Sequence, residues 1–252
     1  MKRTIRAALL ASALCSGAHT ALADEAVSEP RAVDARTVNI NLDGVISLNV
    51  KQGPAALTIY GDPRYLPKVV VEQHGDSLHI GTALHGFQVG KTDLRAELTL
   101  PNLHELVSGG VGSTEINGFS GDTLRLVLDG AGAITAKSQY RNVNVKLAGV
   151  GSINLDAGSS DNMDLNLRGA GSMHVHGQAR KLHASLSGVG SLDARQLQAD
   201  SIDVSLTGLG SARLFAKDSA TMNLTGLGSA TVYGNPANRQ ANARGMGSLH
   251  WE

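Results

Sequence analysis

The sequence has little cysteine, few aromatic residues and no excess of either charge. Its only cysteine, Cys15, lies near the N-terminus, so disulfides and cysteine-ligated zinc are excluded from the rest of the chain. Aromatic residues make up 3% of the 252 residues, so the core must be built from aliphatic side chains. Lys plus Arg equals Asp plus Glu at 22 each, which gives no strong field that would favour nucleic acid. There are only six prolines and no glycine at every third position, so a collagen-like fibre is excluded.

Residues 1–23 have the pattern of a secretory signal peptide. Basic residues stand near the start, a short apolar run follows over residues 7–15, and small residues at 21–23 resemble a cleavage site. That run is too short to span a bilayer, and no later run of 18 apolar residues exists, so we expect no transmembrane segment in the mature chain. We therefore expect an exported protein, located in the periplasm, on the cell surface or in the medium, with residues 24–37 as a polar tether.

Glycine is the residue in excess, and more than half of the 30 glycines follow a repeat. The unit Gly-x-Gly, followed by Ser or Ala, occurs eight times at steps of 18 to 20 residues. Paired glycines in every unit are incompatible with a helical repeat, because each glycine costs about 1 kcal/mol in a helix. We interpret them as structural corner glycines: Gly110, Gly112, Gly130, Gly132, Gly149, Gly151, Gly169, Gly171, Gly188, Gly190, Gly208, Gly210, Gly226, Gly228, Gly245 and Gly247.

Apolar and polar residues alternate strictly on both sides of each glycine corner. Two residues before the first glycine stands a leucine in most copies, as at Leu147 and Leu167, and Ile134 and Ile153 stand four residues after it. A period of two predicts half-buried strands. The sequence therefore predicts an all-β fold, a right-handed parallel β-helix (β-solenoid) of about eight regular coils over residues 109–252, with coils about 4.8 Å apart. An antiparallel meander with hairpin turns at the glycines is the alternative.

The repeat also gives expectations about single positions. The residue between the two glycines is always apolar, so we expect it to point inward, and we expect the Ser or Ala after the second glycine to form an inward-facing ladder. Trp251, in the last copy, is expected to plug the C-terminal end. Residues 38–108 alternate without the glycine repeat, and we predict an irregular N-terminal β region that caps the other end.

The order of short motifs from residue 38 onward resembles one known family. The motifs are Asp43-Gly44-Val45, Gly61-Asp62-Pro63, Leu98-Thr99-Leu100-Pro101-Asn102-Leu103, Ser108-Gly109-Gly110-Val111-Gly112 and Glu115-Ile116-Asn117-Gly118. Together they resemble the DUF2807 family, also called the putative auto-transporter adhesin head or GIN domain, over most of residues 38–252. The resemblance implies a right-handed β-helix of pectin-lyase-like shape, no established catalytic residues and a role in adhesion at the bacterial surface.

The glycine units themselves do not indicate a ligand site. None completes the phosphate-binding pattern G-x-G-x-x-G, and none carries the regular Asp of a calcium-binding repeat, so we expect no catalytic, cofactor or metal site from them. Stacking of the repeats would instead gather polar residues. One predicted column contains Asp164, His183 and Asp203, and a candidate polar ligand face contains Asp156, His174, His176, Asp193 and Arg195.

These polar columns have three interpretations. They are solvated residues paired along the outer face, carboxylates placed to cleave a sugar chain, or His and Asp ligands of a metal. We favour the first, because few aromatic residues are available as a platform for sugar. The expected function is an exported, non-enzymatic adhesin or cell-envelope binding module whose partner is a surface glycan or another envelope component, with weak self-association and no nucleic acid. A polysaccharide lyase or hydrolase is the alternative.

Overall fold

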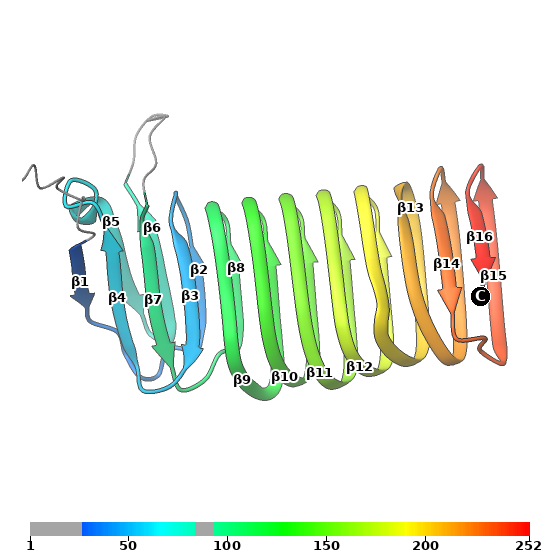
Figure 1. Cartoon of the computed structure of the whole chain (residues 1–252), viewed down its shortest axis with the longest axis horizontal. Coiled ribbons are helices and arrows are strands. Elements are labelled where there is room, and N and C mark those ends of the chain that lie inside the picture. Colours follow the sequence, from blue (N-terminus) through cyan, green and yellow to red (C-terminus); the bar gives the residue numbers. More distant parts are fainter. Residues whose placement is uncertain (1–26, 84–92) are drawn as a thin grey trace, which may run out of the picture.

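The chain forms a rod of stacked β-strands. The structure is a computed structural model that describes residues 27–83 and 93–252, and Figure 1 shows the strands side by side along the long axis. Neighbouring strands of the regular part are parallel, which confirms the predicted β-solenoid and excludes the meander. The rod has about seven turns instead of eight, because eight glycine corners enclose seven complete intervals. No helix in the two described ranges is long and apolar enough to cross a bilayer, and the predicted signal peptide lies outside them.

The regular coils are built from eight strands in chain order. Their neighbours keep one register, so that Ala131, Val150, Ala170 and Val189 lie side by side on successive coils. The register shifts once per coil, on the side away from the glycines. The strands are β9 (Val111–Leu128), β10 (Ala131–Leu147), β11 (Val150–Leu167), β12 (Ala170–Leu186), β13 (Val189–Gly226), β14 (Ser229–Tyr233), β15 (Asn238–Gly245) and β16 (Ser248–Trp251).

The core consists of rows of aliphatic side chains that run along the rod. Leu147 and Leu167 belong to one fully buried row, and Ile134 and Ile153 belong to another. Each such side chain contributes about 1.5–3 kcal/mol when it leaves water. Because equivalent residues stack at equal spacing, one contiguous core runs from the first coil to the last. The sequence alternation therefore predicted the buried rows correctly.

The glycine corner differs from our expectation in the direction of its apolar residue. A Cβ at Gly149 would lie 2.6 Å from the carbonyl oxygen of Asp129 in the preceding coil, so backbone of the neighbouring coil fills that space. Alternation from buried Leu147 then places Val150 on the outside, where 62% of it is exposed. The expectation that this residue points inward is wrong, and the serines of the predicted ladder are exposed or half-buried as well: Ser113, Ser152, Ser172, Ser191, Ser211, Ser229 and Ser248.

The corner opposite the glycines contains the largest buried side chains of the regular part. Phe119 and Tyr140 are each at most 2% exposed there. The Tyr140 hydroxyl donates a hydrogen bond of 2.6 Å to the carbonyl oxygen of Leu103. Burial raises the pKa of Tyr140 to about 12. This hydrogen bond ties the connection before β8 (Glu105–Ser108) to the regular coils.

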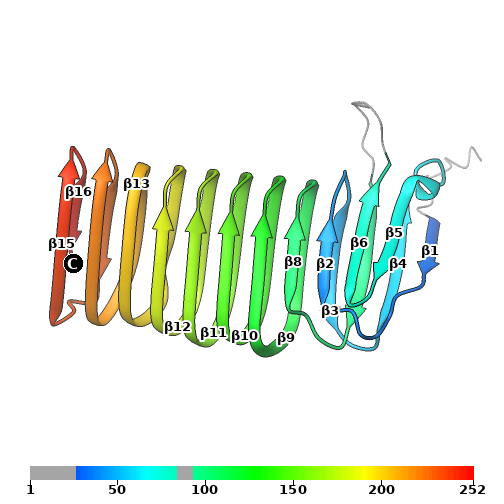
Figure 2. The same cartoon turned by 180° about the vertical axis from the view of Figure 1, so that it is seen from behind.

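The N-terminal coils are stacked in an order that differs from their order along the chain. β2 lies between β6 and β8, and β3 lies between β7 and β9, all in parallel, as Figure 2 shows from behind. The coil made of β2 and β3 is therefore enclosed by two coils that come later in the sequence. The strands concerned are β2 (Asn39–Leu42), β3 (Ser47–Gln52), β6 (Ser77–Thr82) and β7 (Arg95–Leu100).

Antiparallel strands cover the N-terminal end of the rod. β4 (Ala56–Gly61) pairs with β7, and β5 (Val69–His74) pairs with β6 after the short 3₁₀ helix η1 (Leu66–Lys68). β1 (Val27–Arg31) pairs with β4, so the predicted tether over residues 24–37 contains a strand of five residues. This segment pairs because β4 offers an unpaired edge that the polar segment completes.

The C-terminal end of the rod is more open. Every residue of β15 is exposed, because no coil stacks beyond it. Trp251 is half-buried against the core, and the Arg239 guanidinium lies 5.3 Å from the centre of its ring. Trp251 thus packs at the end of the core as predicted, and the cation adds to its contact with the last coil.

Candidate functional site

The predicted polar ligand face lies on adjacent coils of β11, β12 and β13. His174 pairs in register with Asp193, and Asp156 pairs with His176. Arg195 falls out of this register, because the pairing shifts between His174 and His176. A shallow hollow of about 290 Å³ is lined by His174, Val175, His176, Asp193, Arg195 and Gln196, whereas Asp156 lines a separate hollow formed by β9, β10 and β11.

An ion pair dominates the electrostatics of this face. The Arg195 guanidinium donates to both carboxylate oxygens of Asp193, with Nη2 to Oδ2 at 2.7 Å and Nε to Oδ1 at 3.0 Å. These hydrogen bonds lower the pKa of Asp193, to which His174 also contributes, and the carboxylate raises the pKa of Arg195. A general acid needs a raised pKa near neutrality, so the geometry does not prepare Asp193 for that task. In the ranges that the structure describes, no three His, Cys, Asp or Glu side chains gather to hold a metal ion.

The second predicted column lies on the other strand of each coil. Asp164, His183 and Asp203 are neighbours in register, as the repeat alignment predicts. His183 Nδ1 lies 3.8 Å from Asp203 Oδ2, and both side chains are exposed, whereas Asp164 is half-buried. An exposed pair at this distance contributes at most about 1 kcal/mol, so the column is a solvated surface of the rod.

A groove that the sequence did not predict lies on the corner opposite the glycines, and we call it the corner groove. It has a volume of about 350 Å³ and runs along the rod axis across successive coils. Its floor is made of the small residues Ser160, Ala179 and Ala199, each at most 4% exposed. Small side chains on the floor and long ones on both sides create the depression. The lining residues are Ser159, Ser160, Gln178, Ala179, Arg180, Gln198, Ala199, Asp200, Phe215 and Lys217.

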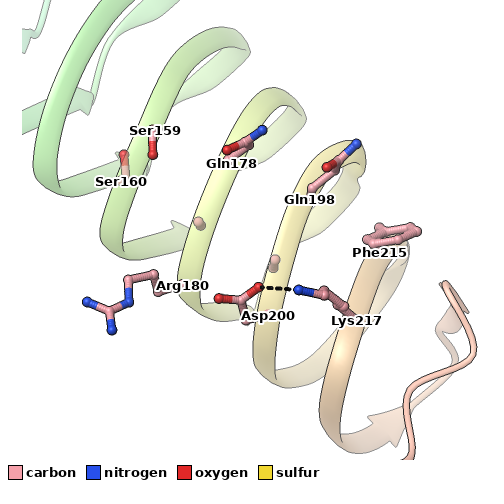
Figure 3. A pocket seen from close by; sticks show the side chains of 10 residues that line it. Ser159, Ser160, Gln178, Arg180, Gln198, Asp200, Phe215 and Lys217 are labelled. Atoms are coloured by element: carbon pink, nitrogen blue, oxygen red, sulfur yellow. Dashed lines mark ion pairs between the residues drawn. The ribbon is translucent and has the colours of Figure 1, made fainter.

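Figure 3 shows the corner groove between two rows of side chains. Gln178, Gln198 and the Phe215 ring form one row, and Arg180, Asp200 and Lys217 form the other. Lys217 Nζ lies 3.9 Å from Asp200 Oδ1, and Arg180 Nη1 lies 3.4 Å from Asp161 Oδ1. The groove therefore offers amides, balanced charges and one aromatic ring, which is a set suited to a hydroxylated, uncharged ligand.

The sequence contains a signal for one side of this groove, beyond the columns used for the prediction. Counted backward from the next glycine pair, the eighth position carries Asp122, Arg141, Asp161, Arg180 and Asp200, with alternating sign. When residues are counted forward from the preceding glycine pair, these charged residues do not align, because the coil length changes between 19 and 20 residues at this corner. The register shifts of the structure lie there as well.

Comparison with known proteins adds the family. The sequence model of the DUF2807 family, described as a putative auto-transporter adhesin, head GIN domain, matches residues 38–174 and 155–236. None of the curated proteins matches the chain.

Several solved structures share this fold. A putative adhesin from Parabacteroides merdae is 20% identical with a TM-score of 0.79, over 90% of this chain and 96% of that one. A putative adhesin from Parabacteroides distasonis is 20% identical with a TM-score of 0.78, over 91% and 98%. A putative lipid binding protein from the same species is 17% identical with a TM-score of 0.73, over 89% and 96%. At these identities the structures establish the shared β-solenoid, and the family match over most of the length shows that this chain belongs to the DUF2807 (GIN domain) family.

Proposed function

We propose that the protein is an exported, non-enzymatic binding module of the bacterial envelope, which holds a saccharide chain in the corner groove. The observation that carries this proposal is the groove itself, with its small-residue floor between two rows of hydrogen-bonding side chains. Membership of a family described as adhesin heads supports a role in attachment. The proposal thus assigns the attachment to one surface of the rod.

The spacing of the coils suits a polymer of sugar units. Coils lie about 4.8 Å apart, and a pyranose unit in an extended chain has a similar length. Gln178 and Gln198 stand in register on adjacent coils, so their amides can meet equivalent hydroxyls of successive units. Phe215 offers a ring face to the apolar side of a sugar at the end of the groove. A ligand of this shape would run parallel to the rod axis.

The charges of the groove favour a neutral saccharide. Lys217 approaches Asp200, and Arg180 approaches Asp161, so each cation near the groove has a carboxylate beside it. Charged groups in such pairs still form strong hydrogen bonds with hydroxyl groups.

The test is a glycan-array screen of the exported chain, followed by calorimetry with the best ligand. Removing both amides with Gln178→Ala and Gln198→Ala should weaken binding about tenfold or more, because two hydrogen bonds of about 1 kcal/mol each are lost. Gln196→Ala is the matched control, since Gln196 is an exposed glutamine of the same strand that lines the hollow of His174 and Asp193.

Three results would contradict this proposal. Loss of binding in Gln196→Ala, with the double variant unchanged, would move the site to the His174 hollow. Shortening of the bound glycan during incubation, detected by mass spectrometry, would show an enzyme. Cell fractionation that finds the chain in the cytoplasm with residues 1–23 intact would contradict export.

A further inference from the structure

An exposed apolar ridge runs along the glycine corners of the rod. Each corner contributes the residue between its two glycines, and Val45 continues the row because it pairs with Val111. Hydrogen bonds from Leu227 N to Gly208 O and from Met246 N to Gly226 O keep the later members in the same row. In rod order the apolar ridge consists of Val45, Val111, Ala131, Val150, Ala170, Val189, Leu209, Leu227 and Met246.

This ridge is the main apolar feature of the described surface. Val150 is 62% exposed, Val189 58% and Met246 85%, and all but one of the large hydrophobic residues exposed in the described ranges belong to it. Single exposed hydrophobic residues are ordinary, whereas a continuous apolar patch on a soluble protein marks a contact surface. Packing within the rod does not require these side chains, because the glycines on both sides already set the distance between coils.

The size of the apolar ridge suits a contact with a second copy of the chain. From the exposed fractions, the eight members from Val45 to Leu227 expose roughly 600 Å² per chain, against about 800 Å² per partner in a standard interface. The glycine and serine rows beside the ridge can supply the rest. The contact is straight and narrow, so its natural partner is another straight ridge of the same length.

The order of large and small residues selects one arrangement. We propose that two copies pack ridge against ridge in antiparallel orientation, with a two-fold axis between Val150 and Ala170. Each alanine of one copy then faces a valine of the other, so projections enter notches along the contact. The facing pairs are Val45 with Leu227, Val111 with Leu209, Ala131 with Val189, and Val150 with Ala170, each formed twice.

Other arrangements fill the contact less well. In a parallel dimer each residue faces its own copy, so Ala131 would face Ala131 and Ala170 would face Ala170, leaving gaps between larger neighbours. The antiparallel register leaves only Met246 beyond the contact. It also directs both corner grooves outward, because the groove lies on the opposite edge of each coil. The dimer would then present two grooves at once.

The first test is the oligomeric state of the exported chain. Sedimentation velocity should show a monomer–dimer equilibrium with a dissociation constant in the micromolar range, about 1–100 µM. Val189→Asp, which places a charge in the contact, should weaken dimerisation at least about 100-fold. Thr135→Asp, on an exposed position of the flat outer face, is the control and should leave it unchanged. Circular dichroism of each variant confirms that the rod is folded.

The second test reads the register through engineered cysteines. The chain has no cysteine after Cys15, so the background is clean once residues 1–23 are absent. Differently tagged Val189→Cys and Ala131→Cys chains should form a disulfide when mixed. Val189→Cys alone should not, because its own copy would lie three coil steps or about 14 Å away, beyond the reach of a disulfide.

Several results would overturn the proposal. A monomer at all concentrations up to about 200 µM would exclude the dimer. Self-linked Val189→Cys without linkage in the mixture would exclude the antiparallel register. A monomer whose Val189→Asp variant loses binding to vesicles of phosphatidylethanolamine and phosphatidylglycerol would assign the ridge to a lipid surface instead.

Discussion

Replacing one corner glycine tests whether close approach of the coils requires glycine at this position. In Gly149→Ala the added methyl group would meet Asp129 backbone atoms of the preceding coil, 2.6 Å from the oxygen and 2.7 Å from the carbonyl carbon. Backbone cannot move aside as a flexible side chain can, so the two coils must separate locally. Gly149 does not have the left-handed conformation that alanine resists, so the effect isolates the steric clash.

The cost can be worked out from the contacts that separation disturbs. The residues on both sides of this glycine donate hydrogen bonds to the preceding coil, from Ala148 N to Leu128 O at 2.8 Å and from Val150 N to Gly130 O at 2.9 Å. Weakening both costs about 1–2 kcal/mol, and the overpacking adds about 1–3 kcal/mol. We expect Gly149→Ala to lower the free energy of unfolding by about 3–4 kcal/mol, a large part of a typical domain stability.

The control is a glycine with the opposite properties. Gly75 has a φ of +62° in the β5–β6 turn, and a Cβ there would meet no atom within 4 Å. Gly75→Ala should lower the free energy of unfolding by only about 1–2 kcal/mol, which is the cost of holding alanine in the left-handed conformation. Urea unfolding followed by circular dichroism measures both variants. If Gly149→Ala costs no more than Gly75→Ala, close approach of the coils is not the reason for the repeated glycines.

Two further predictions concern the buried corner and the open end. Tyr140→Phe should lower the unfolding free energy by about 1–2 kcal/mol in urea titrations, because the Leu103 carbonyl loses its hydroxyl donor. Since burial raises the pKa of Tyr140 to about 12 and the unfolded value is about 10, the stability of the native chain should fall as pH rises from about 10 to 12, and less so in Tyr140→Phe. Trp251→Ala should increase amide hydrogen exchange in β14 and β16 and leave β10–β12 unchanged, because each coil contacts only its neighbours; faster exchange throughout the rod would contradict this.

The regular half of the fold was predictable because its repeat is visible in the sequence. Alternation about the glycines gave the strands, the buried rows and their stacking, including the neighbourhood of Asp164, His183 and Asp203. At the corner itself, hydrophobicity did not predict which side chains point inward. The alternation of the strand and the backbone of the neighbouring coil determine that direction. An apolar residue such as Val150 therefore faces water.

The remainder of the fold could not be predicted, because its determinants are not periodic. The pairing of β1 with β4 depends on an edge that only the assembled end of the rod provides. The corner groove depends on Ser160, Ala179 and Ala199 lying side by side, which requires the register across a corner of variable length. These small side chains do not show the alternation of a strand, so their common place in the coil is visible only when residues are counted backward from the next glycine pair.

The interleaved coil near the N-terminus has a consequence for the time order of folding. Every coil from β10 onward can dock on one that has already left the ribosome. β2 and β3 cannot, since both of their neighbours are formed by residues 77–117, which emerge later. β2 thus lacks a template until β6 follows more than thirty residues later, and β3 lacks one until β7 follows more than forty residues later. These non-local pairings make the coil slow to assemble. The interleaved coil is therefore expected to close later during folding than its position near the N-terminus suggests.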